Sequence, residues 1–207
     1  MVVNSFVVPK ASRLPALLAA LLAVLGASAC ASPRAPSDLR SGVPSDVTLV
    51  GPHGERVDVE RAARASRFTV LVFFSLDCHC FAAHEERLRA LYREYVPRGV
   101  TVWIVDSEVR ASRARDDAEA ERRGLPFPIL LDPGGKLADR LGAEYATYSV
   151  VLDAEARVRY SGGIDSDKTH LRADATPYLR DALDDLLAGR PPRLAVGKAL
   201  GCALERW

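Results

Sequence analysis

The chain has 207 residues, with 28 Lys and Arg against 27 Asp and Glu, so its formal net charge is +1. No basic stripe stands out along the sequence, which argues against nucleic acid as a partner. Apart from residues 1–46, about 160 residues remain, enough for one domain with a hydrophobic core.

Residues 1–29 have the layout of a secretory signal peptide. Lys10 and Arg13 precede an apolar run at residues 14–25, and small residues follow at 26–29. The run is shorter than the roughly 20 apolar residues of a membrane-spanning helix. We therefore expect the mature protein outside the cytoplasm, where disulfides can form.

Cys30 directly follows these small residues. Ala27-Ser28-Ala29-Cys30 resembles a bacterial lipobox, in which the cysteine receives a lipid and becomes the mature N-terminus. Ala27 stands where such a box usually has Leu, and the same residues also fit ordinary signal-peptidase cleavage. We expect a lipoprotein exported across the inner membrane, anchored through Cys30 and facing the periplasm, with a soluble periplasmic protein as the alternative. Residues 30–46, rich in Pro, Ser and Ala, are expected to form a flexible tether.

The expected domain at residues 47–189 begins with strands and helices in alternation. The apolar run at 68–74 is typical of a strand buried on both faces. From residue 78 onward, apolar side chains recur at spacings of three and four, which predicts an amphipathic helix ended by Pro97 and Gly99. The expected elements are a hairpin at 47–50 and 56–59, a strand at 68–74, a helix at 78–95, a strand at 100–105 and a charged helix at 108–123.

The second half adds a short strand, a hairpin and a final helix. Gly142 closes a short helix, and Thr176-Pro177 supplies an N-cap with proline at the first helical position. The expected elements are a strand at 129–131, a helix at 137–141, hairpin strands at 148–152 and 157–160, and a helix ending at 188. Residues 190–207 form an irregular tail that carries Cys202. This order predicts an α/β fold with a central mixed sheet, helices on both faces and an N-terminal hairpin extension.

Cys78 and Cys80, with one residue between them, lie where the strand at 68–74 ends and a helix begins. The unpaired N–H groups and the macrodipole at a helix N-terminus favour a thiolate, so the motif predicts a redox-active sulfur. We expect Cys78 to be the nucleophile, the most reactive thiol and the one with a depressed pKa. His79, when protonated, would lower that pKa, whereas Asp77 would raise it or act as the helix N-cap.

The partner of Cys78 is left open between Cys80 and Cys202. Residues two apart on a helix point to nearly opposite sides, so a Cys78–Cys80 disulfide needs an unwound first turn. Cys202 could resolve a mixed disulfide or simply staple the tail, and in both cases we expect the tail to fold back within bridging reach. Asp106, at the carboxyl end of the second buried strand, is a candidate proton acceptor for the thiol, with a loop and helix cap as the alternative.

The segment at 70–74 before Cys78 and the expected hairpin at 153–160 resemble the redoxin group of the thioredoxin fold. That group includes exported thiol–disulfide reductases and the AhpC/TSA (peroxiredoxin) proteins. The resemblance covers roughly residues 46–187, implies a thioredoxin-like fold and places Cys78 on the family's amino-terminal cysteine.

Three positions depart from the family pattern. Phe81 stands where the second cysteine is usual, and Thr147 stands where a cis-proline usually faces the site, so that loop is expected to be trans or reshaped. Gly201-Cys202 resembles the terminal Gly-Cys of a redoxin subgroup that also carries Asp-Cys at its active site.

The leading functional hypothesis is an exported thiol–disulfide oxidoreductase. Cys78 attacks a partner disulfide, and Cys80 or Cys202 resolves the mixed disulfide. The sulfurs carry the electrons, so no cofactor is implied. The expected partners are proteins outside the cytoplasm, together with an electron donor that the sequence does not identify.

Three other hypotheses stay open. Ser75-x-x-Cys78 resembles the hydroxyl-to-cysteine spacing of peroxiredoxins, which implies a peroxide substrate, although Leu71 stands where their proline is usual. Cys78, Cys80 and His84 form a soft-ligand cluster that loosely resembles thioredoxin-like copper-delivery factors, but His84 also fits a core histidine. The third is a structural lipoprotein stapled by a disulfide, without turnover.

Overall fold

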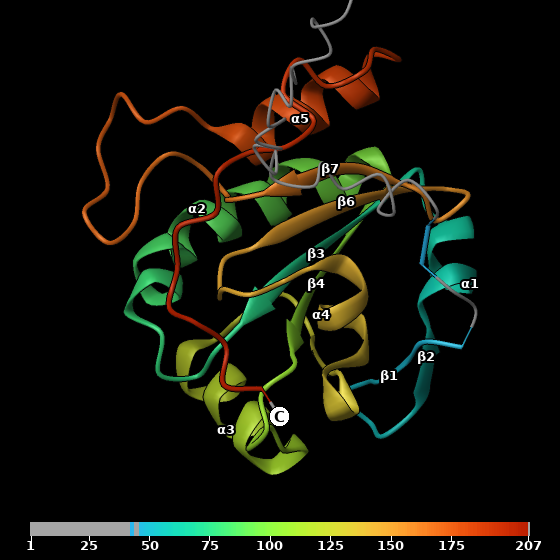
Figure 1. The fold of residues 1–207 in the computed structure, drawn as a ribbon, viewed down its shortest axis with the longest axis vertical. Helices are drawn as coiled ribbons and strands as arrows, with labels where there is room; N and C mark the ends of the chain where they lie inside the picture. Colours follow the sequence, from blue (N-terminus) through green and yellow to red (C-terminus); the bar gives the residue numbers. More distant parts are fainter. Residues whose placement is uncertain (1–41, 44–45, 207) are drawn as a thin grey trace, which may run out of the picture. The chain divides into compact units, whose positions relative to one another are not determined.

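The computed structural model describes residues 42–43 and 46–206, and Figure 1 shows the arrangement of their helices and strands. The expected signal peptide at 1–29, Cys30 and most of the expected tether lie outside the described residues. Within the described part, no helix combines the length and the apolar character that crossing a membrane requires.

A seven-stranded mixed sheet forms the centre of the domain, with strand order β2-β1-β5-β4-β3-β6-β7. Strands β3, β4 and β5 run parallel, whereas the hairpins β1–β2 and β6–β7 add antiparallel strands at the two edges. The strands are β1 (Thr48–Val50), β2 (Arg56–Asp58), β3 (Phe68–Phe74), β4 (Val100–Asp106), β5 (Ile129–Leu131), β6 (Ser149–Asp153) and β7 (Val158–Gly162). The α/β class with a mixed sheet and an N-terminal hairpin is therefore confirmed.

In the described part of the chain, five α-helices accompany this sheet, with α2 and α5 on one side and α1 and α4 on the other in Figure 1. They are α1 (Val59–Arg64), α2 (His79–Tyr95), α3 (Arg113–Arg123), α4 (Lys136–Leu141) and α5 (Tyr178–Leu187). The predicted core-facing stripe of α2 is confirmed, since its buried residues include Phe81, His84, Leu88, Leu91 and Tyr95.

Helices α1 and α3 differ most from the sequence prediction, and the N-cap of α5 is Pro177 instead of the expected Thr176. The charged helix begins at Arg113 instead of residue 108, because the hydroxyl of Ser112 accepts a hydrogen bond from the Arg115 N–H and caps the helix there. Helix α1 was not predicted; the side chain of Asp58 caps it by accepting from the Arg61 N–H. In both cases a short polar residue decides where the helix begins.

The C-terminal tail is irregular, as predicted, and runs back over the domain toward the end of β4 (Figure 1). It first lies along β7, where the Gly197 N–H donates to the Ser161 carbonyl at 2.8 Å. A Cβ atom on Gly162 would lie 2.4 Å from the Gly197 carbonyl oxygen, so only glycine permits this approach. Further along, the Leu204 N–H donates to the Glu144 carbonyl at 3.0 Å. The expectation that the tail folds back is confirmed.

Candidate active site

Three sulfur atoms, two from the start of α2 and one from the C-terminal tail, meet beyond the carboxyl end of β3. Cys78 Sγ lies 2.8 Å from Cys202 Sγ, and Cys202 Sγ lies 3.8 Å from Cys80 Sγ. All three sulfurs lie within 4.8 Å of one another, and each belongs to a free cysteine. Cys78 and Cys80 are buried, whereas Cys202 is partly exposed. Cys202 is therefore within bridging reach of Cys78, as predicted.

The first turn of α2 sets the position of Cys78. Cys78 is the N-cap residue, in extended conformation, and its sulfur accepts a hydrogen bond from the Phe81 N–H at 3.3 Å. Asp77 was expected as a possible N-cap; that expectation is wrong, because Asp77 lies one residue earlier and is exposed. A thiol at an N-cap takes the role that a Ser or Asp oxygen usually has, which ties the sulfur to the helix end.

The electrostatics of the cluster differ from the sequence prediction. Burial, followed by the hydrogen bond with Cys202, raises the pKa of Cys78 above its ordinary value. Burial likewise raises the pKa of Cys80, to about 12. The prediction that Cys78 has a depressed pKa is therefore wrong.

Cys202 is the thiol whose pKa is lowered. Burial opposes its ionisation, but hydrogen bonds from the Cys78 and Cys80 thiols, together with the backbone N–H groups of Cys80 and His79, outweigh that cost and lower the pKa. The N–H groups at the N-terminus of α2 thus favour the thiolate of Cys202, a sulfur from the tail, whereas the sequence prediction assigned the thiolate to Cys78.

A hollow of about 280 Å³ opens beside Cys78. It is lined by Leu76, Asp77, Cys78, His79, Ala82 and Arg123. Asp77 and His79 are exposed there, which suits residues that meet a partner. Ser75 is buried beneath them, and its carbonyl accepts a hydrogen bond from the Cys78 N–H at 3.2 Å.

Thr147 lies on the loop that precedes β6 and faces the tail. The described residues contain no cis peptide bond, so this loop is trans, with Thr147 at φ 74°. A β-branched residue in that region is strained by about 1–3 kcal/mol. The strain is offset locally: the Thr147 N–H donates to the Phe73 carbonyl at 2.8 Å and its hydroxyl donates to the Leu200 carbonyl at 3.1 Å.

Ala146, the residue before Thr147, completes the attachment of the tail. The Ala146 N–H donates to the Cys202 carbonyl at 2.9 Å. A Cβ atom on Gly201 would lie 1.8 Å from the Ala146 carbonyl oxygen, so the tail can approach this loop only through a glycine. The Gly-Cys pair in the tail therefore has a steric reason: the glycine lets the backbone close on the loop and the cysteine then reaches Cys78.

Asp106 is not brought to the sulfurs by any described hydrogen bond. It is buried at the end of β4, and its carboxylate accepts from the Glu108 N–H at 2.9 Å, which fits the loop-cap alternative. Burial, with a contribution from the neighbouring carboxylate of Asp116, raises the pKa of Asp106 to about 8. Asp116 is fully buried on helix α3, and neither of its carboxylate oxygens has a hydrogen-bond partner among the described residues. No sequence pattern indicated that these two carboxyl groups are neighbours.

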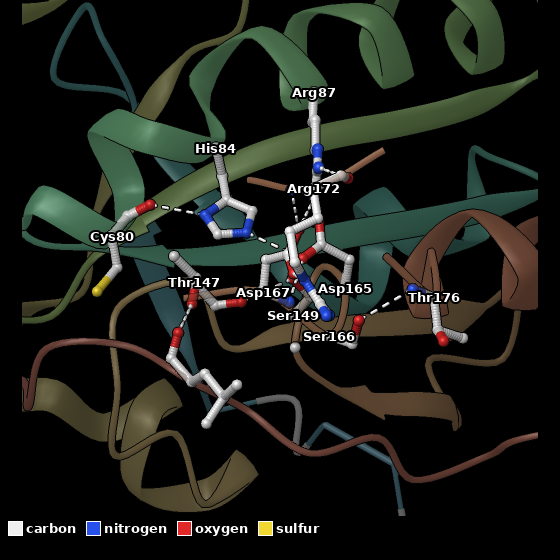
Figure 2. Close-up of polar contacts among 12 residues, drawn as sticks. Cys80, His84, Arg87, Thr147, Ser149, Asp165, Ser166, Asp167, Arg172 and Thr176 are labelled. Atoms are coloured by element: carbon white, nitrogen blue, oxygen red, sulfur yellow. Dashed lines mark hydrogen bonds and ion pairs between the residues drawn. The ribbon is translucent and has the colours of Figure 1, made fainter. Parts of the chain in front are cut away.

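His84 is held away from the sulfur cluster by both of its ring nitrogens (Figure 2). Nδ1 lies 2.7 Å from the Cys80 carbonyl oxygen, and Nε2 lies 3.1 Å from Oδ1 of Asp165. The group of metal-capable side chains found in the described part contains Cys202 in place of His84. The copper-site hypothesis that used His84 as a ligand is therefore wrong, because a histidine with both nitrogens committed cannot also bind an ion.

Asp165 links His84 to an ion-pair network built on two buried aspartates, shown in Figure 2. Arg87 Nη1 lies 2.5 Å from Asp165 and 3.1 Å from Asp167, and Arg172 Nε lies 2.9 Å from Asp167. Burial alone would lower the pKa of His84, but its hydrogen bonds to Asp165 and to the Cys80 carbonyl raise it overall. The network ties the segment between β7 and α5 to α2 and fixes the backbone of Cys80.

Several solved structures share this fold. An uncharacterised conserved protein from Geobacillus kaustophilus is 25% identical, with a TM-score of 0.70, 80% of this chain and 91% of that chain covered. A hypothetical protein from Sinorhizobium meliloti 1021 is 23% identical, also with a TM-score of 0.70, over 80% of this chain and 94% of that one. The C-terminal domain of a thiol-disulfide oxidoreductase from Bacteroides thetaiotaomicron, described as putative, has a TM-score of 0.54 at 14% identity, over 69% and 91% of the two chains. These neighbours confirm a thioredoxin-like fold.

The comparison with protein families adds evidence from the sequence. A search among curated proteins finds no match. The model of the AhpC/TSA family matches residues 43–161, which contain the N-terminal hairpin, the strands β3 to β7, helix α2 and two of the three clustered cysteines. The matched segment is more than half of the chain, and the expected redoxin resemblance is confirmed: the protein belongs to the AhpC/TSA family.

Proposed function

We propose that this protein is a thiol–disulfide oxidoreductase whose redox couple is Cys78 and Cys202. The observation that carries the proposal is the 2.8 Å separation of their sulfur atoms. A disulfide requires about 2.05 Å, so a shift of less than 1 Å in the partly exposed tail would join them. Membership of the AhpC/TSA family supports thiol-based redox chemistry at this position.

The two thiols have different roles in the proposed reaction. Cys78 lines the hollow that a partner can enter, so its sulfur attacks the partner disulfide. Cys202, the thiol with the lowered pKa, carries the negative charge of the reduced site and accepts the Cys78 proton across the short S–H···S contact. Attack forms a mixed disulfide and releases one partner sulfur as a thiolate, which takes the proton back from Cys202.

Resolution then completes a two-electron transfer. The Cys202 thiolate attacks Cys78 Sγ, the Cys78–Cys202 disulfide forms, and the second partner sulfur leaves as a thiolate. The partner disulfide has gained two electrons and becomes a dithiol, whereas the protein has lost two. The same steps in reverse would oxidise a partner dithiol, and a separate thiol donor or acceptor must return the protein to its starting state.

The proposed setting is the periplasmic side of a membrane. The signal-like layout of residues 1–29 and the lipobox-like sequence ending in Cys30 support an exported lipoprotein. The partners would then be exported proteins with disulfides or thiols. Labelling with a radioactive fatty acid, compared between the wild type and Cys30→Ser, tests the anchor: a label that persists in the variant would contradict it.

Reduction of insulin disulfides by dithiothreitol tests the catalytic proposal. The wild-type protein should accelerate the reaction, and Cys78→Ser should remove the acceleration. Cys202→Ser should accumulate a mixed disulfide through Cys78, which is visible by mass spectrometry of the intact protein. An active Cys78→Ser variant would contradict the proposal.

A second candidate is peroxide reduction, favoured by the AhpC/TSA family itself. The Cys78 thiolate would take an oxygen atom from a hydroperoxide, giving a sulfenic acid and an alcohol. Cys202 would then condense with the sulfenic acid, forming the same disulfide and releasing water. Peroxide consumption by the reduced protein, with dimedone labelling of Cys78 in Cys202→Ser, distinguishes this reaction from exchange with protein disulfides.

A further inference from the structure

The redox couple leaves one sulfur of the cluster unused. Cys80 Sγ lies 3.8 Å from Cys202 Sγ, is buried, and takes no part in the proposed exchange between Cys78 and Cys202. We propose that the three reduced thiols of Cys78, Cys80 and Cys202 also form a three-coordinate site for the soft monovalent ion Cu(I). Binding of Cu(I) by the reduced thiols requires no turnover of the redox couple, and it goes beyond the proposed oxidoreductase activity.

The sulfur positions suit a metal at their centre. With metal–sulfur bonds of about 2.3 Å, a trigonal site separates its sulfurs by about 4 Å. The separation between Cys80 and Cys202 is already 3.8 Å, and all three sulfurs lie within 4.8 Å of one another. The 2.8 Å separation between Cys78 and Cys202 must widen by about 1 Å, and the partly exposed tail that carries Cys202 allows this.

The donor set selects Cu(I) over Zn(II). Both ions accept thiolate ligands, but zinc in a closed protein site takes four. Among the described residues, the cluster supplies three sulfurs and no fourth His, Asp or Glu. His84, the nearest buried histidine in sequence, has both ring nitrogens committed to Cys80 and Asp165.

The surroundings compensate the charge that such a complex carries. Three thiolates and one Cu(I) ion leave a net charge of −2, which burial alone would disfavour. The Phe81 N–H donates to Cys78 at 3.3 Å, and the positive end of the α2 macrodipole favours negative charge beside this helix end. The hollow beside Cys78, which Arg123 helps to line, gives the ion a route to the sulfurs.

Copper binding and the redox couple exclude each other. A Cys78–Cys202 disulfide removes two of the three ligands, so only the fully reduced protein can hold the ion in this way. Loading releases the thiol protons and changes no oxidation state: three thiols and one Cu(I) ion give the trithiolate complex and up to three protons.

Anaerobic titration of the fully reduced protein with Cu(I), in competition with bathocuproine disulfonate, tests the site. We expect one ion per chain, three Cu–S contacts by X-ray absorption, and affinity that falls more than about tenfold in Cys80→Ser and in Cys202→Ser. His170→Gln, a change at an exposed histidine outside the sulfur cluster and its hollow, should bind as the wild type does.

Three results would overturn the proposal: unchanged affinity in Cys80→Ser, which would indicate a two-coordinate site; loss of affinity in His170→Gln; or displacement of Cu(I) by equimolar Zn(II). Disulfide mapping of the copper-free wild-type protein reports the redox function separately. Failure of either function is therefore visible without the other.

Discussion

The sulfur atoms of Cys78 and Cys202 lie 2.8 Å apart although the two residues are 124 positions apart in the sequence. Backbone contacts of the tail with the loop before β6 create this proximity, and the N-terminus of α2 determines which of the two sulfurs carries charge. The active site is therefore assembled from a helix end, a strained loop and a tail, and each of these parts can be tested by itself.

The close approach of the C-terminal tail to the loop before β6 should depend on Gly201. In Gly201→Ala the new Cβ would lie 1.8 Å from the Ala146 carbonyl oxygen, so the tail must move away from the loop. We expect Cys78–Cys202 disulfide formation in a glutathione buffer to slow by about tenfold or more. Lys198→Ala, an exposed change in the same tail, is the matched control and should leave the rate unchanged. Equal rates in the two variants would show that the glycine is not what positions Cys202.

The thiolate of the reduced protein should reside on Cys202. Its lowered pKa means that the charged, reactive form is present at a pH below the ordinary thiol range, whereas the raised pKa values of Cys78 and Cys80 keep them protonated there. Alkylation by iodoacetamide at pH 7, followed by peptide mapping, should label Cys202 first. Removing the Cys78 thiol donor in Cys78→Ala should raise the pKa of Cys202, and faster labelling of Cys78 in the wild type would reverse this assignment.

Replacing Asp116 by Asn should stabilise the protein at alkaline pH. Burial raises the pKa of Asp116 to about 6 and that of Asp106 to about 8. A carboxyl group with a raised pKa in the folded state favours folding at low pH, and this contribution is lost as the pH rises through the folded-state value. Asp116→Asn should therefore unfold less easily at pH 8, by on the order of 1–3 kcal/mol, and differ little at pH 4.

Denaturant titrations at the two pH values measure this difference. Asp117→Asn is the control, because Asp117 is the adjacent, half-exposed residue paired with Arg113, and such surface pairs contribute at most about 1 kcal/mol. A stability gain that is the same at pH 4 and pH 8 would contradict the assignment to carboxyl ionisation.

Replacing Asp165 by Asn should destabilise the protein most in mildly acidic solution. The pKa of His84 is raised, so the stability from its charged form is present below its unfolded value near 6.5 and is lost as the pH rises through the folded value. The pKa of Asp165 is lowered, so its contribution is lost as the pH falls below the ordinary Asp range. The cost of Asp165→Asn should be about 3 kcal/mol between pH 5 and 6 and smaller at pH 9.

The exposed Asp174, 3.9 Å from Arg172, provides the comparison: Asp174→Asn should change the free energy of unfolding little at any pH. A cost for Asp165→Asn that does not vary between pH 5 and pH 9 would exclude His84 as the titrating group.

Strand β3 and helix α2 could be predicted from the sequence because the residue pattern that forms each of them lies within the element itself. The apolar run of β3 agrees with its observed bounds at both ends, and α2 differs only by one residue at its N-terminus. The helix at 108–123 was predicted too long because charged residues continue before Ser112, and charge alternation alone does not locate the cap. Helix α1 was not predicted, because its six residues are too few for a periodic pattern to stand out.

The site was only partly predictable. The return of the tail, which brings Cys202 to Cys78, was predicted correctly, and the Gly-Cys pair in the tail pointed to Cys202. The ionisation state could not be predicted, since it depends on which sulfur occupies the space before the α2 N-terminus. Nor could the contact of His84 with Asp165, which lies 81 residues away in a loop without a motif.

The pairing of cysteines in the oxidised protein tests the central claim most directly. The wild-type protein is equilibrated with glutathione disulfide, its remaining thiols are alkylated, and the disulfide-linked peptides are identified by mass spectrometry. The account predicts a single intramolecular link between Cys78 and Cys202, with Cys80 alkylated. A link between Cys78 and Cys80, or a protein in which all three thiols remain free, would contradict it.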